Sequence, residues 1–598
     1  MKRTTLKNAA FFALKTLIFT VVLSISLLYF FPVTYARNFA YSPHGDSAVH
    51  NRWVDSVFAT MTPDERVGQL FMVEVSSKWG AADKLYKNVE QYITDYHIGG
   101  VLFFYGGPNR QAAITNKLQS ISKVPLMIAQ DAEWGLGMRL DSTISYPRQL
   151  TLGAIENEDL VYKTGLEIAR QCRRLGVNID FAPCVDIYDN PGNSVIVNRS
   201  FGSDKQEVAR KSLAIMSGMQ DGGILTTAKH FPGHGNTVTD SHYDLPIIKG
   251  DKQRIDTFEL YPFKYLINNG VKGVMVGHLF VEAYDDSISQ TPSSISENII
   301  SKLLKKNLGF QGLVFTDALA MQGVSRNYPS GELEVRAFKA GVDVFLQPKD
   351  FVAAYNGIIA ARDSGYISQK EIDIRCKKIL LAKKQLGLDN FQPVSTENLY
   401  QDLNNDYAQN LQSQIVENSI TLIKNRDNLL PLKDLSSKRI AAVSIGKIAE
   451  ETEFEISLRR FTNLDVFTIE KEAEPASFTT LSDTLKTYDL VIIGFHNCNA
   501  YPPRFGFTAN SINFAETLAK TTPVVLGIFT NPMGFTKFNP KNDNFAAIIV
   551  AYDDTPLARR IAGEMVFGEL PFKGRLPVRI NAKYPHGTGF KTEGFKVY

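Results

Sequence analysis

The chain has 598 residues, more than one hydrophobic core normally serves, so two or more domains are expected. Hydrophobic residues make up 44% and charged residues 21%, which is typical of a soluble globular protein and excludes a disordered or fibrous one. The formal net charge is +3, and removing the four positive charges of residues 1–36 lowers it to −1, so no basic face indicates nucleic-acid binding.

The first 36 residues have the pattern of an export signal. Four basic residues precede or interrupt an apolar run of 16 residues, 16–31, and a small residue follows at Ala36. This pattern predicts a signal peptide cleaved after Ala36. The alternative is an uncleaved anchor with N-terminal membrane association, because 16 residues is just below the usual spanning length. We therefore expect an exported protein in the periplasm or cell envelope.

Residues 37–388 are predicted to form a catalytic (β/α)8 barrel. Near-continuous apolar runs separated by helix-length spacers are typical of parallel strands covered by helices. Eight such units fit a closed barrel better than an open sheet, whose edge strands should be more polar. The runs are 67–75, 98–104, 125–131, 177–187, 224–231, 273–279, 312–319 and 341–348.

The remaining chain is predicted to form a linker and a second domain. The segment 389–410 begins with an Asn- and Asp-rich stretch and indicates a linker. Residues 411–598 contain further apolar runs with helical spacers, which predict a smaller α/β domain with a parallel or mixed sheet. These runs are 439–446, 489–495, 522–529 and 545–552.

Isolated polar residues of the barrel segment collect at the ends of its apolar runs. The third run ends in Asp131, the fifth in Lys229 and His230, the sixth near His278 and the seventh in Asp317. Capping of the next helix would explain any one of them. Four strand ends of this kind predict a polar active-site pocket, because barrel enzymes carry their catalytic groups at the C-terminal ends of the strands.

The segment 229–246, KHFPGHGNTVTDSHYDLP, carries three histidines and raises metal binding as one hypothesis. His230, His234 and His242 lie in an irregular stretch without the i, i+4 spacing of a helical zinc site, and the four cysteines have no zinc-finger spacing. We favour acid/base catalysis, with no metal and no cofactor. Asp240 precedes His242 by two residues, so in an extended segment the carboxylate can orient the imidazole and raise its basicity.

Asp317 is the predicted partner of this acid/base. A carboxylate at the end of a buried apolar strand suits a nucleophile that forms a covalent glycosyl intermediate. Retaining glycosidases combine such a nucleophile with a separate proton donor, which is usually a second carboxylate. Here His242 would take the second role.

The same residues carry a resemblance to a known family. The segment 229–246 closely resembles the signature loop of the family 3 glycoside hydrolases that act as β-N-acetylglucosaminidases. The resemblance spans the barrel and continues beyond it, and it implies a (β/α)8 barrel followed by a smaller α/β sandwich domain. The other segments that resemble family motifs are LMIAQDAEWG (126–135), VNRSFGSD (197–204), LVFTDALAMQGV (313–324), LIKNRDNLLPL (422–432) and KGRLPV (573–578).

By this resemblance, Asp317 is the nucleophile, His242 the acid/base and Asp240 its support. The β-glucosidases of the family take their acid/base from a glutamate outside this loop, so the Asp-x-His pair favours an N-acetylhexosaminidase. The implied reaction is retaining release of terminal β-linked N-acetylglucosamine from peptidoglycan-derived or related sugars. The alternatives are a β-glucosidase and a non-catalytic sugar-binding protein. The residues expected to bind sugar hydroxyls are Asp131, Arg199, Lys229 and His230.

The chain departs from the family pattern at Trp134. The family usually reads Asp-Gln-Glu-Gly-Gly where this chain reads Asp131-Ala132-Glu133-Trp134-Gly135. The indole either stacks on a sugar or narrows the entrance, or it packs against the barrel rim. The sequence indicates a carbohydrate as partner and gives no oligomeric state.

Overall fold

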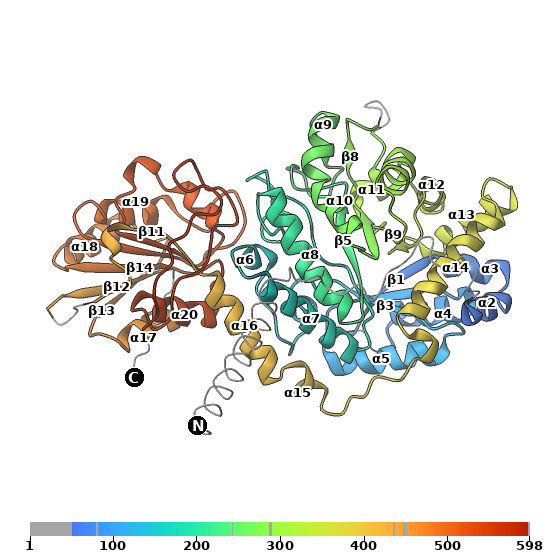
Figure 1. Ribbon diagram of the computed structural model, residues 1–598, viewed down its shortest axis with the longest axis horizontal. Coiled ribbons are helices and arrows are strands. Elements are labelled where there is room, and N and C mark those ends of the chain that lie inside the picture. Colours follow the sequence, from blue (N-terminus) through green and yellow to red (C-terminus); the bar gives the residue numbers. More distant parts are fainter. Residues whose placement is uncertain are drawn as a thin grey trace, which may run out of the picture. The chain divides into compact units, whose positions relative to one another are not determined.

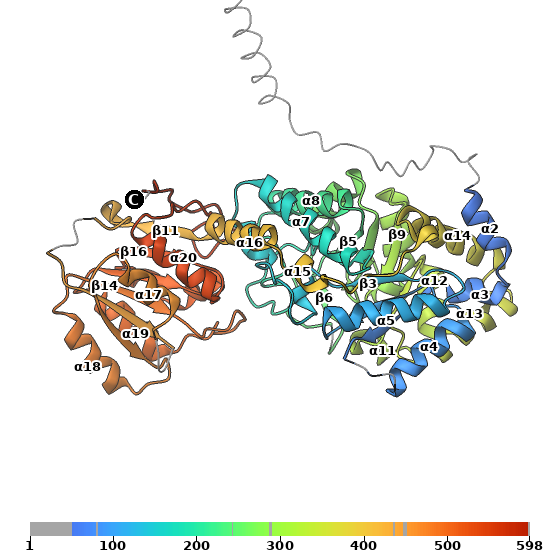
Figure 2. The ribbon, with the colours of Figure 1, turned by 90° about the horizontal axis from the view of Figure 1, so that it is seen from below.

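The structure is a computed structural model that describes residues 51–78, 80, 82–241, 243–285, 290–433, 437–446 and 451–595 (Figure 1, Figure 2). Val49–Tyr598 forms one compact unit. The predicted signal or anchor, residues 1–36, lies outside the described residues. Within the described ranges, no helix is both long enough and apolar enough to span a bilayer.

The first domain is the predicted (β/α)8 barrel, and each predicted apolar run contains a strand. The strands are parallel and follow the order β10-β1-β2-β3-β4-β5-β7-β9. A bridge between Phe315 and Val344 joins the two ends of this order, which closes the barrel. The strands are β1 (Phe71–Ser76), β2 (Gly100–Phe104), β3 (Met127–Gln130), β4 (Ile179–Asp180), β5 (Leu225–Phe231), β7 (Gly273–Val276), β9 (Leu313–Thr316) and β10 (Phe345–Leu346).

Helices follow the strands and cover the outside of the barrel (Figure 1). Their apolar faces and the buried strands form one continuous core, in which the rings of Phe181 and Phe315 lie 5.3 Å apart. Two short strands pair in parallel outside the barrel sheet: β6 (Ile247–Ile248), which follows β5, and β8 (Phe280–Val281), which follows β7. The main helices are α4 (Lys84–Tyr96), α5 (Pro108–Ile121), α7 (Glu158–Arg174), α8 (Lys205–Asp221), α10 (Tyr261–Asn268), η4 (Asn298–Asn307), α12 (Glu332–Ala340), α13 (Phe351–Asp363) and α14 (Gln369–Gln385).

The segment 389–410, predicted as a linker, is partly helical. It contains α15 (Leu399–Leu403) and the first turn of α16 (Asp406–Ser419), so the predicted boundary at 410 falls inside a helix. Its polar residues cap helices: the side chain of Asn405 accepts the N–H of Ala408 at the start of α16. Leu411 of α16 belongs to the barrel core and Val416 to a core of the second domain, so this helix contributes to both.

The second domain is the predicted α/β sandwich. Its six-stranded sheet has the order β11-β16-β15-β14-β12-β13, with β11 antiparallel to β16 and the other pairs parallel. Helices α18 (Pro475–Leu485) and α19 (Ala509–Leu518) cover one face, and α17 (Glu453–Arg459) and α20 (Pro556–Val566) the other (Figure 1). The strands are β11 (Thr421–Asn425), β12 (Ile440–Ile445), β13 (Asp465–Ile469), β14 (Leu490–Phe495), β15 (Val524–Ile528) and β16 (Ala547–Val550).

Candidate active site

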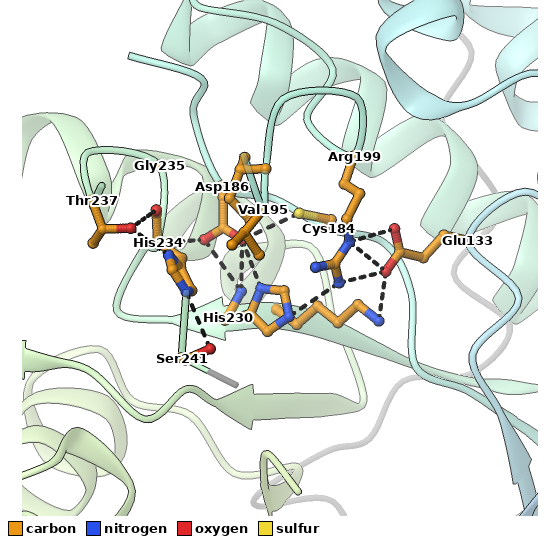
Figure 3. A network of polar contacts seen from close by, with 12 residues as sticks. Glu133, Cys184, Asp186, Val195, Arg199, His230, His234, Gly235, Thr237 and Ser241 are labelled. Atoms are coloured by element: carbon orange, nitrogen blue, oxygen red, sulfur yellow. Dashed lines mark hydrogen bonds and ion pairs between the residues drawn. The ribbon is translucent and has the colours of Figure 1, made fainter. Parts of the chain in front are cut away.

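The charged residues at the ends of β3 and β5 form one ion network. The Nζ of Lys229 lies 2.9 Å from Oδ1 of Asp131 and 2.8 Å from Oε1 of Glu133. Arg199, on the loop after β4, donates to both oxygens of Glu133 at 2.7–3.1 Å (Figure 3). Arg139 holds the other oxygen of Asp131 at 2.5 Å. The structure thus brings Asp131, Lys229 and Arg199 together through Glu133, a residue to which no sequence pattern assigned a role.

The groups of this network keep their charges because they are paired. Burial opposes ionisation of Asp131, but Lys229 and Arg139 outweigh it and hold the pKa of this carboxyl well below its usual range. Burial likewise disfavours the carboxylate of Glu133, yet Arg199 and Lys229 lower its pKa to about 2. Charged donors and acceptors fixed in this way can form strong hydrogen bonds with vicinal sugar hydroxyls.

His230, the fourth predicted sugar-binding residue, joins the network through its ring. Its Nε2 lies 3.2 Å from Nη2 of Arg199, and its Nδ1 lies 2.8 Å from Oδ2 of Asp186. A guanidinium can only donate, so Nε2 accepts and the ring proton belongs on Nδ1, which donates to Asp186. The carboxylate of Asp186 also accepts the backbone N–H groups of His230 and His234, at 3.2 and 2.7 Å (Figure 3). Asp186 therefore positions both histidines, a role that no sequence pattern predicted.

Asp317 directly follows β9 and is half-buried. Its backbone N–H donates to the carbonyl of Val276, and its Oδ1 accepts the N–H of Ala318 at 2.8 Å. His278, which follows β7, reaches the same turn: its Nε2 lies 3.0 Å from the carbonyl oxygen of Ala318, and its Nδ1 lies 2.7 Å from Oγ of Ser294. His278 thus supports the backbone next to Asp317.

The loop with the predicted acid/base contacts the loop that follows Asp317. The N–H of Gly323 donates to the carbonyl of Ser241 at 3.3 Å. A Cβ at Gly323 would lie 2.6 Å from that oxygen, so only glycine allows this approach. Asp240, next to Ser241, is half-buried. His242 lies outside the described residues, so its placement beside Asp240 stays a prediction.

His234 is buried beneath this loop. Its Nδ1 lies 2.7 Å from Oγ1 of Thr237, and its Nε2 lies 3.4 Å from Oγ of Ser241. Burial and the neighbouring His230 lower the pKa of His234 to about 4, so this ring is neutral at neutral pH. These contacts support a structural role for His234.

Within the described residues, one group of side chains has a spacing that could hold a metal ion: Cys184, Asp186 and His230, whose ligand atoms lie within 4.8 Å of one another. Of the two described histidines in the segment 229–246, this group includes His230 and not His234. The Asp186 carboxylate already accepts three N–H groups and the thiol of Cys184 at 3.1 Å. These hydrogen bonds account for the close approach of the three side chains.

Similarity to known proteins agrees with this geometry. Residues 62–382, more than half of the chain, match the family described as "Glycosyl hydrolase family 3 N terminal domain". The chain belongs to glycoside hydrolase family 3. The match covers every barrel strand and every residue of the network described above.

Relatives of this family 3 enzyme include proteins that match most of the chain. Beta-hexosaminidase A of Pseudoalteromonas piscicida is 30% identical over 62% of this chain and 69% of its own length. A "Beta-N-acetylglucosaminidase/beta-glucosidase" of Cellulomonas fimi is 27% identical over 88% of this chain and 95% of its own. The solved family 3 β-N-acetylglucosaminidase of Paenibacillus sp. str. FPU-7 aligns with a TM-score of 0.72 and 29% identity, over 87% of this chain and 99% of the other. The chain is therefore a glycosidase of the β-hexosaminidase/β-glucosidase type.

Proposed function

We propose that this family 3 glycosidase is a retaining β-N-acetylglucosaminidase, which releases terminal non-reducing β-linked N-acetylglucosamine. The hydrogen bond from Gly323 to Ser241 carries the proposal, because it holds Ser241, the residue after Asp240, against the loop that begins at Asp317. A nucleophile and a proton donor on two adjoining loops are what a double-displacement mechanism needs.

In the first step, a carboxylate oxygen of Asp317 attacks the anomeric carbon and forms a glycosyl ester. The bond to the leaving-group oxygen breaks, and the protonated imidazole of His242 gives its proton to that oxygen. In the second step, neutral His242 takes a proton from water, whose oxygen attacks the anomeric carbon and releases Asp317. Two inversions leave the sugar with its original β configuration.

The ion network supports the assignment of the sugar subsite. Asp131, Lys229, Arg199 and His230 would hydrogen-bond the hydroxyls of the sugar held by the nucleophile, and Glu133 fixes the two cations. Hydrogen bonds from charged groups can strengthen as the oxocarbenium-like transition state develops.

Hydrolysis of aryl β-glycosides tests the specificity. We expect turnover of aryl β-N-acetylglucosaminide and much weaker turnover of aryl β-glucoside. The reverse order would support a β-glucosidase, an alternative favoured by the double activity in the name of the Cellulomonas fimi relative. Turnover of neither substrate would support a non-catalytic sugar-binding protein.

We also propose that the enzyme is exported and acts on peptidoglycan-derived muropeptides or related sugars in the periplasm or cell envelope. The basic and apolar pattern of residues 1–36 supports export. Immunoblotting of cell fractions, with the N-terminus of the isolated protein sequenced, would separate a cleaved signal from an anchor.

A further inference from the structure

The loop that carries Arg199 is held by the second domain as well as by the barrel. Asn531, just beyond β15, donates from Nδ2 to Oδ1 of Asn198 at 2.7 Å and to the carbonyl of Val197 at 3.2 Å. Asn198 in turn donates to the carbonyl of Ala500, another residue of the second domain, at 3.1 Å. The two residues before Arg199 are therefore fixed by groups that lie more than 300 residues further along the chain.

Asn531 is completely buried and uses both ends of its amide. Its exposed fraction is 0%, and its nitrogen makes the two contacts with the loop. Its Oδ1 accepts the N–H of Met533 at 2.8 Å, which caps the short helix η7 (Pro532–Lys537). Rotating the amide would turn its donors toward the N–H of Met533 and leave buried polar groups unpaired, so one orientation is strongly favoured. Asn531 thus presents fixed donors to the loop.

The rest of the loop is packed against the same domain. The side chain of Val197 is fully buried and shares a hydrophobic core with strands β12, β14 and β15. After Arg199, the N–H of Ser203 donates to the carbonyl of Pro577 at 3.0 Å. A Cβ at Gly202 would lie 2.2 Å from that carbonyl oxygen, so only glycine allows this approach. The second domain therefore contacts the loop on both sides of Arg199.

The guanidinium of Arg199 needs an exact position, because its donors are shared within the sugar network. They reach Glu133 at 2.7–3.1 Å and Nε2 of His230 at 3.2 Å. The bonds of this planar fork depend on direction, and a displacement of about 1 Å at a catalytic site can cost about 100-fold in rate. We propose that Asn531 is a positioning residue, which fixes the loop 196–203 so that Arg199 keeps the orientation that the sugar requires. The second domain thereby completes the sugar subsite of the barrel. This role rests on the function proposed above, in which Arg199 binds sugar hydroxyls.

A double-mutant cycle between Asn531 and Arg199 tests this role. The cycle is needed because the barrel also holds Arg199, through Glu133 at the guanidinium and Gln149 at the carbonyl. Asn531→Ala should lower kcat/KM for an aryl β-N-acetylglucosaminide about 10-fold in the native background, because the guanidinium is displaced. In an Arg199→Ala background there is no guanidinium to position, so the same change should cost less than about 2-fold. Arg199→Ala leaves Glu133 paired with Lys229, so this background should fold.

Two further variants separate the contact with the loop from the stability of the second domain. Asn531→Asp keeps the oxygen that caps Met533 but loses the donors to the loop, so it should lower kcat/KM at least as much as Asn531→Ala. Asn425→Ala is the matched control, because the amide of Asn425 makes two hydrogen bonds of 2.9 Å with the backbone of Leu430, inside the second domain. It should keep kcat/KM within about 2-fold in both backgrounds.

The outcomes separate this role from the proposed function. Equal losses after Asn531→Ala in the two backgrounds, or no loss in the native one, would overturn the positioning role while turnover of the aryl substrate still upholds the proposed function. The cycle uses whichever aryl β-glycoside the native enzyme hydrolyses, and turnover of none would remove the function and this role together. If Asn531→Ala does not fold, Asn198→Ala replaces it, because it removes the same hydrogen bond from the side of the barrel.

Discussion

The Nζ of Lys229 lies 2.9 Å from Oδ1 of Asp131, although 98 residues separate them in the chain. The contact joins the ends of β5 and β3, and Glu133 extends it to Arg199. Lys229 is only 2% exposed, so its ammonium group is stable there only because two carboxylates surround it. The predicted sugar-binding residues are therefore one electrostatic unit, in which each charge depends on the others.

Replacing Lys229 with Met should disable the site. It leaves Asp131 and Glu133 buried without their shared cation, so we expect kcat/KM to fall about 100-fold or more and the melting temperature to drop. Lys211→Met is the matched control. Lys211, on α8, is also 2% exposed, but its ammonium group donates to the backbone carbonyls of Ile155 and Glu156 and not to the network. This variant should therefore keep more of the activity than Lys229→Met. Adding Asp131→Asn to Lys229→Met should recover part of the melting temperature. Full activity in Lys229→Met would contradict the network's role.

The raised pKa of Asp180, at the end of β4, should appear in the pH dependence of the melting temperature. Burial raises its pKa to about 7, well above the value of about 4 in the unfolded chain. Its contribution is fully present below about pH 4 and is lost as the pH rises through 7. Asp180→Asn, which can still accept the N–H of Ala132, should therefore melt at a higher temperature than the native protein at pH 8 but not at pH 4.

The pKa of Asp186 is shifted in the opposite direction, so a variant at this residue serves as the comparison for Asp180→Asn. Burial disfavours its carboxylate, but His230 and His234 outweigh burial and hold its pKa well below the usual value. Its stabilising effect is present above about pH 4 and is lost only as the pH falls through the lowered pKa. Asp186→Asn should thus lower the melting temperature from pH 5 to 8. A melting curve of Asp180→Asn that stays parallel to the native curve between pH 4 and 9 would refute the assignment of Asp180, and an unchanged melting temperature of Asp186→Asn would refute that of Asp186.

The proton-donor role of His242 predicts a dependence on the leaving group. His242→Ala should slow hydrolysis of substrates with poor leaving groups by about 10²–10⁴-fold, because their oxygen needs a proton as the bond breaks. Dinitrophenyl β-N-acetylglucosaminide releases a phenolate that needs no proton, so its sugar should transfer to Asp317 at close to the native rate. His234→Gln, the control within the same loop, should affect both substrates equally. A uniform loss in His242→Ala would remove His242 from this role.

Chelation should leave the enzyme active. The three N–H groups and one thiol on the Asp186 carboxylate stabilise it without a cation. Activity before and after EDTA treatment, with added Zn²⁺ as a second arm, checks this expectation. Loss on chelation with recovery on Zn²⁺ addition would instead assign a metal to Cys184, Asp186 and His230.

The barrel strands were predictable because each is buried on both faces and therefore apolar along its length. The strand β13 was missed because it is an edge strand without an apolar run: Asp465 and Thr468 are exposed, and its other three residues are only half-buried. The strand β11 was missed because it pairs antiparallel at the other edge and ends in Lys424 and Asn425. Continuous hydrophobicity identifies interior strands only.

Within the site, sequence position identified residues at strand ends but not the carboxylates that hold them. The position of Asp186 inside the apolar run 177–187 was the one signal in the sequence for its role, because a buried carboxylate needs a partner. The identity of its partners, His230 and His234, depends on the folded path of a loop more than 40 residues away. The contact between Trp134 and Arg148 depends on tertiary packing in the same way.

The proposed mechanism requires a covalent intermediate on Asp317, which can be trapped. A 5-fluoro-N-acetylglucosaminyl fluoride slows the second step more than the first, so the glycosyl ester accumulates. Peptide mass spectrometry should then find the added sugar on Asp317, and Asp317→Ala should show no adduct and no turnover. An adduct on another carboxylate, or a product with inverted configuration and no adduct, would contradict this mechanism.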